Sequence, residues 1–359
     1  AIFTPTTRSI LRSLVKVLAT DMGFGYTKAT DGRSHQLFKS ILGEANPAQF
    51  GESLVGNGSQ PPRHFRLGDE AFFVGEWAET QSRGRRFTLD PAQFMAKHAK
   101  HLALAAIAPY APDGDPIRLV TGLPVSFFKR YREAVTALLK GRHALVVFGA
   151  DGRPVEQQLY IEQVRVIPQP FGSLFGLMLN NLGKPSSQRF VTEKIGIIDI
   201  GFRTADFTIS DKTRYSERGS LSTDSGMSSA YARVASHLQD QSGVSIELFR
   251  LHEAFTHGSL RVKGTLYDLK PVIQQAFDQL AERIATEVNR LWSDDWDLEA
   301  IVITGGGGKA LYPRLKPLID GEVLAMPEHE DPRLANVNGY WKYGVHLWGG
   351  AASATAPPA

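Results

Sequence analysis

The amino-acid sequence predicts a duplicated α/β fold of two domains, and three observations support this prediction. Strand-like and helix-like segments alternate in both halves of the 359-residue chain. Each half opens on an apolar segment that ends in Asp-x-Gly, "ATDMG" in the first half and "IIDIG" in the second. A third glycine turn, "TGGGGKA", follows an apolar segment late in the second half. We place the two domains at residues 14–168 and 169–349, with smaller insertions at about 43–88 and 213–296.

The first domain begins with a strand at Lys16–Asp21 and continues through a hairpin that turns at Asp31–Ser34. Residues 43–66 are rich in Gly, Pro, Asn and Ser and have weak periodicity, which indicates an irregular segment. "FRLGDEAFFVGEWA" then predicts a second hairpin. This block is typical of a small insertion in a larger domain.

The rest of the first domain alternates helices and strands. Asp90 and Pro91 are a typical N-cap and first helical residue, so a helix should run from there to about Ala108. "IRLVTGLP" predicts a buried strand, and "SFFKRYREAVTALLK" predicts an amphipathic helix. A hairpin that turns at Asp151-Gly152 should follow.

The second domain repeats this arrangement. Lys194–Gly201 predicts an apolar strand, and Gly226–Gln239 predicts a helix. Pro271–Trp292 is the clearest helix, because its apolar residues recur at steps of three and four. "EAIVITGGGGKAL" then predicts a strand, a glycine turn and a helix.

The composition limits the classes of protein to consider. Hydrophobic residues make up 42% and charged residues 21% of the chain, as in soluble globular proteins. The absence of cysteine excludes disulfides, zinc ribbons and thiol chemistry, and a net charge of +3 does not indicate nucleic-acid binding. Near the basic start of the chain, Arg12 and Lys16 interrupt the apolar run before it is long enough for a signal peptide. We therefore expect a cytoplasmic protein. Residues 350–359 and the first dozen residues are expected to be disordered.

The three glycine turns carry the residue types that a nucleotide with Mg²⁺ requires. Glycine lets backbone N–H groups approach phosphate oxygens, carboxylates hold the waters of the metal, and a cation neutralises the terminal phosphates. "DMGFGYTK" and "DIGFRTAD" supply aspartates, glycines and a lysine, but neither a Walker pattern nor a GxGxxG helix start occurs. Each turn in isolation is more often a plain turn. The three turns in this order favour a nucleotide site.

These turns resemble the phosphate-1, phosphate-2 and adenosine motifs of the actin-like ATPase superfamily. Within it, the sequence is most similar to the ParM/StbA group of plasmid-segregation actins, through "LVTGLPVSFFKRYRE" and the ending "DPRLANVNGYWKYG". The resemblance implies an actin-like, ribonuclease H-like duplicated fold in which a nucleotide cleft lies between the two domains.

The resemblance also implies roles for individual residues. Asp21 and Asp199 would hold Mg²⁺ through water, and Gln169 would orient the attacking water. Phe24 replaces the usual hydroxyl residue of phosphate-1, and Phe202 and Arg203 replace small residues of phosphate-2, so their side-chain contacts stay open. Arg203 is either a phosphate contact or a solvent-facing residue. The nucleotide-binding set is Gly23, Phe24, Gly25, Tyr26, Lys28, Gly201, Phe202, Arg203, Thr204, Gly305, Gly306 and Gly307.

The function that the resemblance implies is a Mg-dependent ATPase whose hydrolysis is coupled to polymerisation. Its filaments would segregate plasmid DNA through a DNA-binding adaptor protein, without direct contact to DNA or membrane. The nucleotide would be ATP, with GTP as the alternative. Two other functions stay open on the same fold, a small-metabolite kinase and a non-polymerising ATPase of chaperone or scaffold type.

Three further patterns have simpler interpretations than a site. His98 and His101 lie three residues apart without a carboxylate at metal-ligand spacing, so packing is the better interpretation. "SDDWDLE" (Ser293–Glu299) lacks the central glycine of a calcium loop and is interpreted as an acidic turn. "RGRR" (Arg83–Arg86) could contact a partner, but a solvated loop is favoured.

Overall fold

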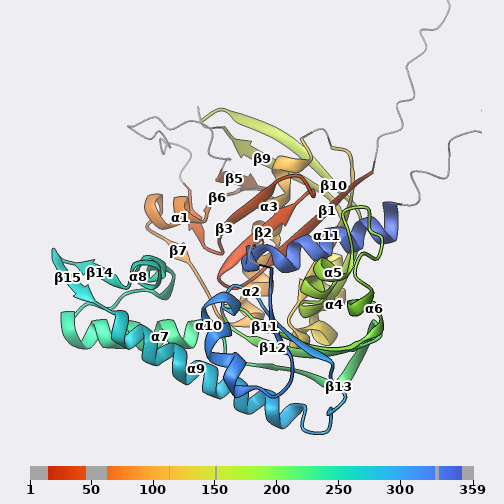
Figure 1. The fold of residues 1–359 in the computed structure, drawn as a ribbon. Helices are drawn as coiled ribbons and strands as arrows, with labels where there is room; N and C mark the ends of the chain where they lie inside the picture. The colour runs from red at the N-terminus through yellow and green to blue at the C-terminus, as the bar shows by residue number, and fades with distance from the viewer. Residues whose placement is uncertain (1–14, 46–62, 113, 150–151, 328–330, 350–359) are drawn as a thin grey trace, which may run out of the picture.

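The computed structural model describes residues 15–45, 63–112, 114–149, 152–327 and 331–349 (Figure 1). The predicted disordered ends, most of the irregular segment at 43–66, and Asp151 of one predicted turn lie outside these ranges. Within them the two halves of the chain build two separate sheets. The predicted hairpins and the strands before the glycine turns are all present.

The first sheet has ten strands in the order β3-β2-β1-β8-β10-β9-β5-β6-β4-β7. Strand β1, third in this order, runs antiparallel to β2 and parallel to β8. All of its strands come from the first 168 residues. They are β1 (Lys16–Met22), β2 (Tyr26–Thr30), β3 (His35–Lys39), β4 (Leu42–Glu44), β5 (His64–Leu67), β6 (Glu70–Val74), β7 (Arg85–Arg86), β8 (Pro116–Leu123), β9 (Gly141–Phe148) and β10 (Pro154–Pro168).

The second sheet has five strands in the order β13-β12-β11-β16-β17. Its central strand β11 runs antiparallel to β12 and parallel to β16, as β1 does with β2 and β8. The predicted duplication is therefore confirmed at the level of strand order and direction. The strands are β11 (Lys194–Ile200), β12 (Ala205–Asp211), β13 (Arg214–Thr223), β16 (Ala300–Thr304) and β17 (Val323–Ala325), and a separate hairpin pairs β14 (Ser259–Val262) with β15 (Thr265–Asp268).

The helices agree with the predicted periodicity apart from one break. The Asp90 side chain caps its helix by accepting from the Gln93 amide at 2.6 Å, as predicted. His98, with a φ of −120°, then divides the expected helix into two. The helices are α1 (Glu76–Gln81), α2 (Pro91–Lys97), α3 (Ala99–Ile107), α4 (Val125–Leu139), α5 (Pro170–Met178), α6 (Gln188–Thr192), α7 (Met227–Ser242), α8 (His252–His257), α9 (Lys270–Leu291), α10 (Gly308–Leu315) and α11 (Ala335–Trp348).

Helices α5 and α11 connect the two halves. Their buried residues share one hydrophobic cluster with β1 and β8 of the first sheet and with β11 and β16 of the second. Figure 1 shows α11, at the blue end of the chain, beside β1 and α5. The end of the chain therefore packs back onto the first sheet. The domain division at 168/169 stays a prediction.

Glycines allow α5 and α11 to approach closely. A Cβ atom added to Gly339 of α11 would lie 1.6 Å from the carbonyl oxygen of Gly172 in α5. A Cβ atom on Gly344 would lie 2.7 Å from the Val17 side chain of β1. These are the two glycines of the ending "ANVNGYWKYG", so this part of the motif has a packing role.

We predict that Gly339→Ala lowers the free energy of unfolding by about 2 kcal/mol, because a methyl group there forces the helices apart. Gly176→Ala is the matched control in α5, since its Cβ would meet the nearest atom, the Ala335 carbonyl oxygen, at 3.5 Å. The control should change stability by less than about 1 kcal/mol. Urea unfolding followed by circular dichroism measures the free energy of unfolding of both variants. Equal losses of stability in Gly339→Ala and Gly176→Ala would contradict the close packing of the two helices at Gly339.

Candidate functional site

Two hairpins with the same backbone geometry carry the first two glycine turns. In the first, β1 pairs with β2 so that Asp21 lies opposite Lys28. In the second, β11 pairs with β12 so that Asp199 lies opposite Asp206, at the same separation of seven residues. In both turns the amide of the first glycine donates to a carbonyl three residues later. These bonds join Gly23 to Tyr26 at 3.1 Å and Gly201 to Thr204 at 2.9 Å.

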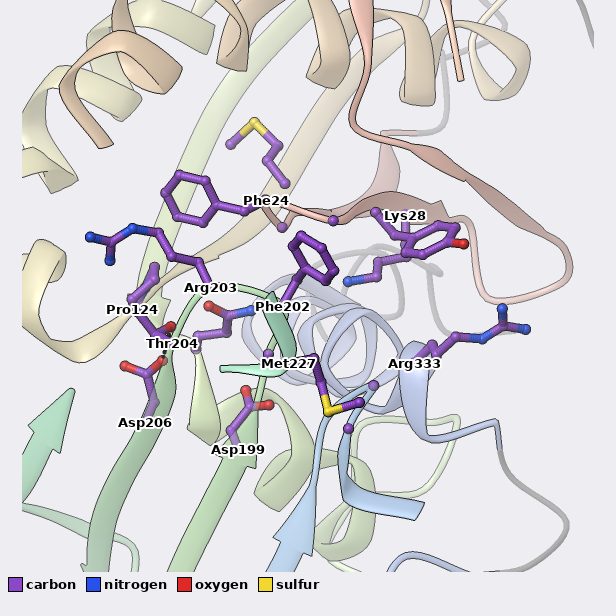
Figure 2. A pocket seen from close by; sticks show the side chains of 18 of the residues that line it. Phe24, Lys28, Pro124, Asp199, Phe202, Arg203, Thr204, Asp206, Met227 and Arg333 are labelled. Carbon is purple, nitrogen blue, oxygen red and sulfur yellow. Dashed lines mark hydrogen bonds between the residues drawn. The ribbon is translucent and has the colours of Figure 1, made fainter. Parts of the chain in front are cut away.

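Both turns border one cavity between the two sheets (Figure 2). The structure brings the predicted residues together there. Asp21 and Gly305 do not line the cavity but contact residues that do, Lys28 and Asp199 respectively. The predicted residues that line it are Gly23, Phe24, Gly25, Tyr26, Lys28, Gln169, Asp199, Gly201, Phe202, Arg203, Thr204, Gly306 and Gly307.

Asp21, Lys28 and Gln169 form a polar group on the side of the first sheet. The Lys28 ammonium donates to Asp21 Oδ2 at 2.8 Å, and both side chains are largely buried. The Gln169 amide nitrogen lies 3.4 Å from Asp21 Oδ1, at the end of β10 where α5 begins. A cation, a carboxylate and an amide are thus held at one edge of the cavity. Lys28 lines the cavity, and its ammonium has two further N–H donors besides the one that it gives to Asp21.

Asp199 faces this group from the second sheet and is fully buried. Burial and the neighbouring carboxylates of Asp206 and Asp21 together raise the pKa of its carboxyl group to about 7, against the lowering effects of the hydrogen bond from Asn336 and of Lys28. Gly305 packs so closely that a Cβ atom there would lie 2.2 Å from Asp199 Oδ1. The first glycine of "TGGGGKA" is therefore required by the aspartate of the preceding motif.

Asn336 is a site residue that the sequence did not reveal. Its amide nitrogen donates to Asp199 Oδ2 at 2.7 Å, and its oxygen accepts from the Ser173 amide at 3.0 Å and from the Ser173 hydroxyl. Ser173 Oγ in turn lies 2.6 Å from Thr304 Oγ1. The network links α11, α5, β11 and β16. The signal for it was the Asn in "ANVNG", which the sequence analysis quoted without assigning a role.

Asp206 is a second residue that the sequence did not reveal. It is buried, and burial raises the pKa of its carboxyl group. It accepts from Thr204 Oγ1 at 2.7 Å, from the Ser222 hydroxyl, and from the Val125 amide at 2.8 Å. The last bond caps the start of α4 from the opposite half of the chain. Its position seven residues after Asp199, like Lys28 after Asp21, was the available signal.

Arg203 neither faces solvent nor points toward Lys28 in this structure. Figure 2 shows its guanidinium turned away from Lys28 and Phe202. Its Nε donates to the Leu89 carbonyl at 2.5 Å, and its Nη1 lies 3.0 Å from Asp224. The guanidinium also lies 5.5 Å from the Phe24 ring. Arg203 therefore bridges the two halves, and a phosphate contact from it stays a prediction.

The two unusual phenylalanines fill space around the turns. Phe24 is 9% exposed and packs against Phe94 with ring centroids 4.8 Å apart. Phe202 packs across the first turn, where a Cβ atom on Gly25 would lie 2.8 Å from the Phe202 Cβ. Its ring contacts Tyr231 at a centroid distance of 5.2 Å. Gly25 is thus required by the bulk of the facing turn.

The outer parts of the two halves touch across the cavity. Phe249, which precedes α8, is buried in the cluster of Phe73 and Ala78 from the insertion of the first half. Arg85 lies 3.6 Å from Glu247. The prediction of a solvated loop for "RGRR" was wrong, because Arg85 and Arg86 form β7 and pair with β4. The cleft is closed in this conformation.

The donor set suits a metal held through its waters. Within the described ranges, no group of three or more His, Cys, Asp or Glu side chains is placed to hold a metal directly. Asp21 and Asp199 are two carboxylates at the cavity, and Mg²⁺ is usually held by one or two carboxylates while it keeps several waters.

In the described part of the chain, no helix is both long and apolar enough to span a membrane.

Comparisons with known proteins agree with this geometry. The family model "Actin like proteins N terminal domain" matches residues 19–172, and "Archaeal actin homologue MreB-like, C-terminal" matches residues 197–317. A search of curated proteins found no match.

Solved structures resemble the chain over nearly its whole length. A non-polymerisable quadruple mutant of pCBH ParM has 25% identity and a TM-score of 0.75, with 91% of this chain and 98% of that chain covered. A 15-stranded ParM filament from Clostridium botulinum has 23% identity and a TM-score of 0.76, with 92% and 99% covered. The archaeal actin homolog Ta0583 in complex with ADP has 19% identity and a TM-score of 0.73, with 91% and 98% covered.

The fold and the two matched models agree on one class, because both halves of the chain resemble actin-like proteins. Its structural neighbours are ParM plasmid-segregation actin homologues and archaeal actin homologues. The predicted two-domain actin-like fold is confirmed.

We predict that Asp199 makes stability pH-dependent in the nucleotide-free protein. Its pKa rises from 3.8 to about 7 on folding, so its protonated form favours the folded state. This contribution is present below pH 3.8 and is lost as the pH rises through about 7. Asp199→Asn keeps an acceptor for Asn336 but cannot ionise, so its stability advantage over wild type should grow across this window. Urea unfolding at several pH values measures it, with exposed Asp211→Asn as control. If the free energy of unfolding changes with pH in the same way for Asp199→Asn and wild type, the raised pKa of Asp199 is contradicted.

Proposed function

We propose that this chain is a Mg-dependent ATPase that assembles into filaments in its nucleotide-bound state. The observation that carries the proposal is the pair of matching hairpins. They place Asp21 and Lys28 on one side of a single cavity and Asp199 on the other, with glycine turns at both edges. The ADP complex of the structurally similar Ta0583 supports a nucleotide in this cleft. ATP is the proposed nucleotide, with GTP as the alternative.

The residues at the cavity would act in different ways. Lys28 would donate to a terminal phosphate, and turn amides other than those of Gly23 and Gly201, which already donate to Tyr26 and Thr204, would donate to phosphate oxygens. Asp21 and Asp199 would hold the waters of Mg²⁺, which supplies positive charge against the developing charge of the phosphates. Gln169 would position the attacking water, because an amide orients water without deprotonating it.

The glycines of the third turn would leave room for the nucleoside. Gly306 and Gly307 line the cavity beside Arg333, whose Cγ lies 3.7 Å from where a Cβ atom on Gly306 would stand. Tyr26 and His252 face each other from opposite halves with ring centroids 5.7 Å apart. Burial raises the pKa of Tyr26 to about 12, so its hydroxyl stays a hydrogen-bond donor at neutral pH.

Self-association is proposed from the structural neighbours. ParM from Clostridium botulinum and Alp12 were both solved as filaments, and each of those chains is covered over almost its whole length. By analogy, filaments of this protein would segregate plasmid DNA in the cytoplasm through a DNA-binding adaptor, with no direct contact to DNA. Closure of the cleft around nucleotide would select the conformation that assembles.

The small-metabolite kinase is a weaker candidate. Such an enzyme requires a carboxylate that is free to accept a proton from the substrate hydroxyl. Asp206 lines the cavity, but its oxygens already accept three hydrogen bonds, from Thr204, Ser222 and Val125. This arrangement supports a structural role for Asp206 at the start of α4.

We predict that Asp199→Ala lowers the rate of Mg-dependent phosphate release from ATP at least about 100-fold, because a preorganised charged group is lost from the site. Asp211→Ala is the matched control, since Asp211 lies exposed at the far end of the same hairpin, and it should hydrolyse ATP at the wild-type rate. Phosphate release is measured at saturating ATP with and without Mg²⁺. Wild-type activity in Asp199→Ala would show that this cavity is not the hydrolytic site.

A further inference from the structure

A pocket outside the cleft lies beyond the C-terminal end of α9. It has a volume of about 740 Å³ and is bordered by the segment between α9 and β16 and by the turn before β17. Trp296 stands at its edge with 90% of its surface exposed, although large apolar side chains are normally buried. The acidic turn "SDDWDLE" predicted from the sequence therefore forms the wall of a pocket.

The pocket contains a buried carboxylate with an unused oxygen. The Asp295 side chain is 0% exposed, and its Oδ1 accepts from Lys194 Nζ at 2.9 Å and from Arg218 at 2.5 Å. Its Oδ2 is buried and has no hydrogen-bond partner among the described residues. A buried acceptor without a partner is costly, so a donor from outside the chain would be stabilised there.

The surroundings of the pocket are acidic. Asp294 and Asp297 are exposed on either side of Trp296, with Asp297 paired to Lys194 at 2.5 Å, and Asp320 lines the pocket from the facing turn. Of the described residues that line the pocket, none is a lysine or an arginine. The complementary ligand therefore combines an apolar group for Trp296 with cations for the acidic edge.

The β14–β15 hairpin has these complementary properties. Leu266 is 59% exposed, and Arg261, Lys263 and Lys270 are exposed around it with Asp268 as the one acid of the stretch Ser259–Lys270. Lys263 stands at the tip, before Gly264. The hairpin thus presents an apolar side chain among cations.

The two surfaces lie at opposite ends of one rigid element. Helix α9 has 22 residues and is about 33 Å long. Figure 1 shows the β14–β15 hairpin near one end of α9, and the segment that carries Trp296 follows its other end. Within one molecule the two surfaces cannot meet. A contact between different surfaces of successive copies is head-to-tail, and it generates an open filament when the rotation between copies does not close a ring.

We propose that the β14–β15 hairpin of one copy docks on the Trp296 pocket of the next, with Leu266 against Trp296 and Lys263 at the acidic edge. The proposal rests on the self-association proposed above and identifies the surfaces that carry it. A second copy is favoured over another partner because opposite charges and exposed apolar side chains occur on the same chain.

Charge reversal tests the contact. Lys263→Glu and Asp294→Lys should each raise the critical concentration for assembly with Mg-ATP at least about tenfold, because like charges then face each other. The double variant restores opposite charges and should return to within about twofold of wild type. Lys184→Glu is the matched control, since Lys184 follows the 72% exposed Leu182 in another turn and should leave assembly unchanged. Sedimentation gives the critical concentration, and ATP affinity should be equal in all variants.

Cross-linking gives a second readout, since the chain has no cysteine. With Mg-ATP and an oxidant, the variant with both Lys263→Cys and Asp294→Cys should give a ladder of linked copies, whereas Lys184→Cys with Asp294→Cys should not. If wild type assembles, Lys263→Glu assembles equally well and no ladder forms, then this contact alone is overturned. A wild type that binds ATP but stays monomeric would overturn both this contact and the proposed self-association.

Discussion

The hydrogen bond from Asn336 to Asp199 joins the end of the chain to the centre of the cleft, across 137 positions of sequence. Asp199 is buried beside two other carboxylates, and the Asn336 amide opposes the rise in its pKa. Asn336 is itself fixed by Ser173, which contacts Thr304. Helix α11 must therefore lie against α5, and this explains the glycines at the helix contact. The positions of both sheets relative to the cavity depend on this buried polar network.

A second constraint acts from outside the cavity. Arg203 of the second half is held by the Leu89 carbonyl of the first, and Phe249 is buried in the insertion of the first half. These contacts stabilise a closed cleft, and phosphate contacts from both turns would add to the same conformation. In the proposed function, closure of the cleft around nucleotide would couple nucleotide binding to assembly.

The sequence predicted the parts of the site that are encoded locally. Asp-x-Gly after an apolar strand identified the two glycine turns that border the cavity, and apolar residues at steps of three and four identified α9. Asn336 and Asp206 escaped prediction because their partners lie far away in sequence, Asp199 for one and Val125 for the other. The bridging position of Arg203 likewise depends on Leu89, 114 residues away. Local patterns specify turns and faces, whereas packing between the halves decides which polar groups meet.

The most direct test of the account is light scattering recorded in parallel with phosphate release after Mg-ATP is added to the purified protein. The account predicts that scattering rises on addition of Mg-ATP and decays as phosphate appears, because the nucleotide-bound state assembles and hydrolysis loosens it. Phosphate release with flat scattering across a broad range of protein concentrations would contradict it, and would leave a nucleotide site in a protein that does not polymerise.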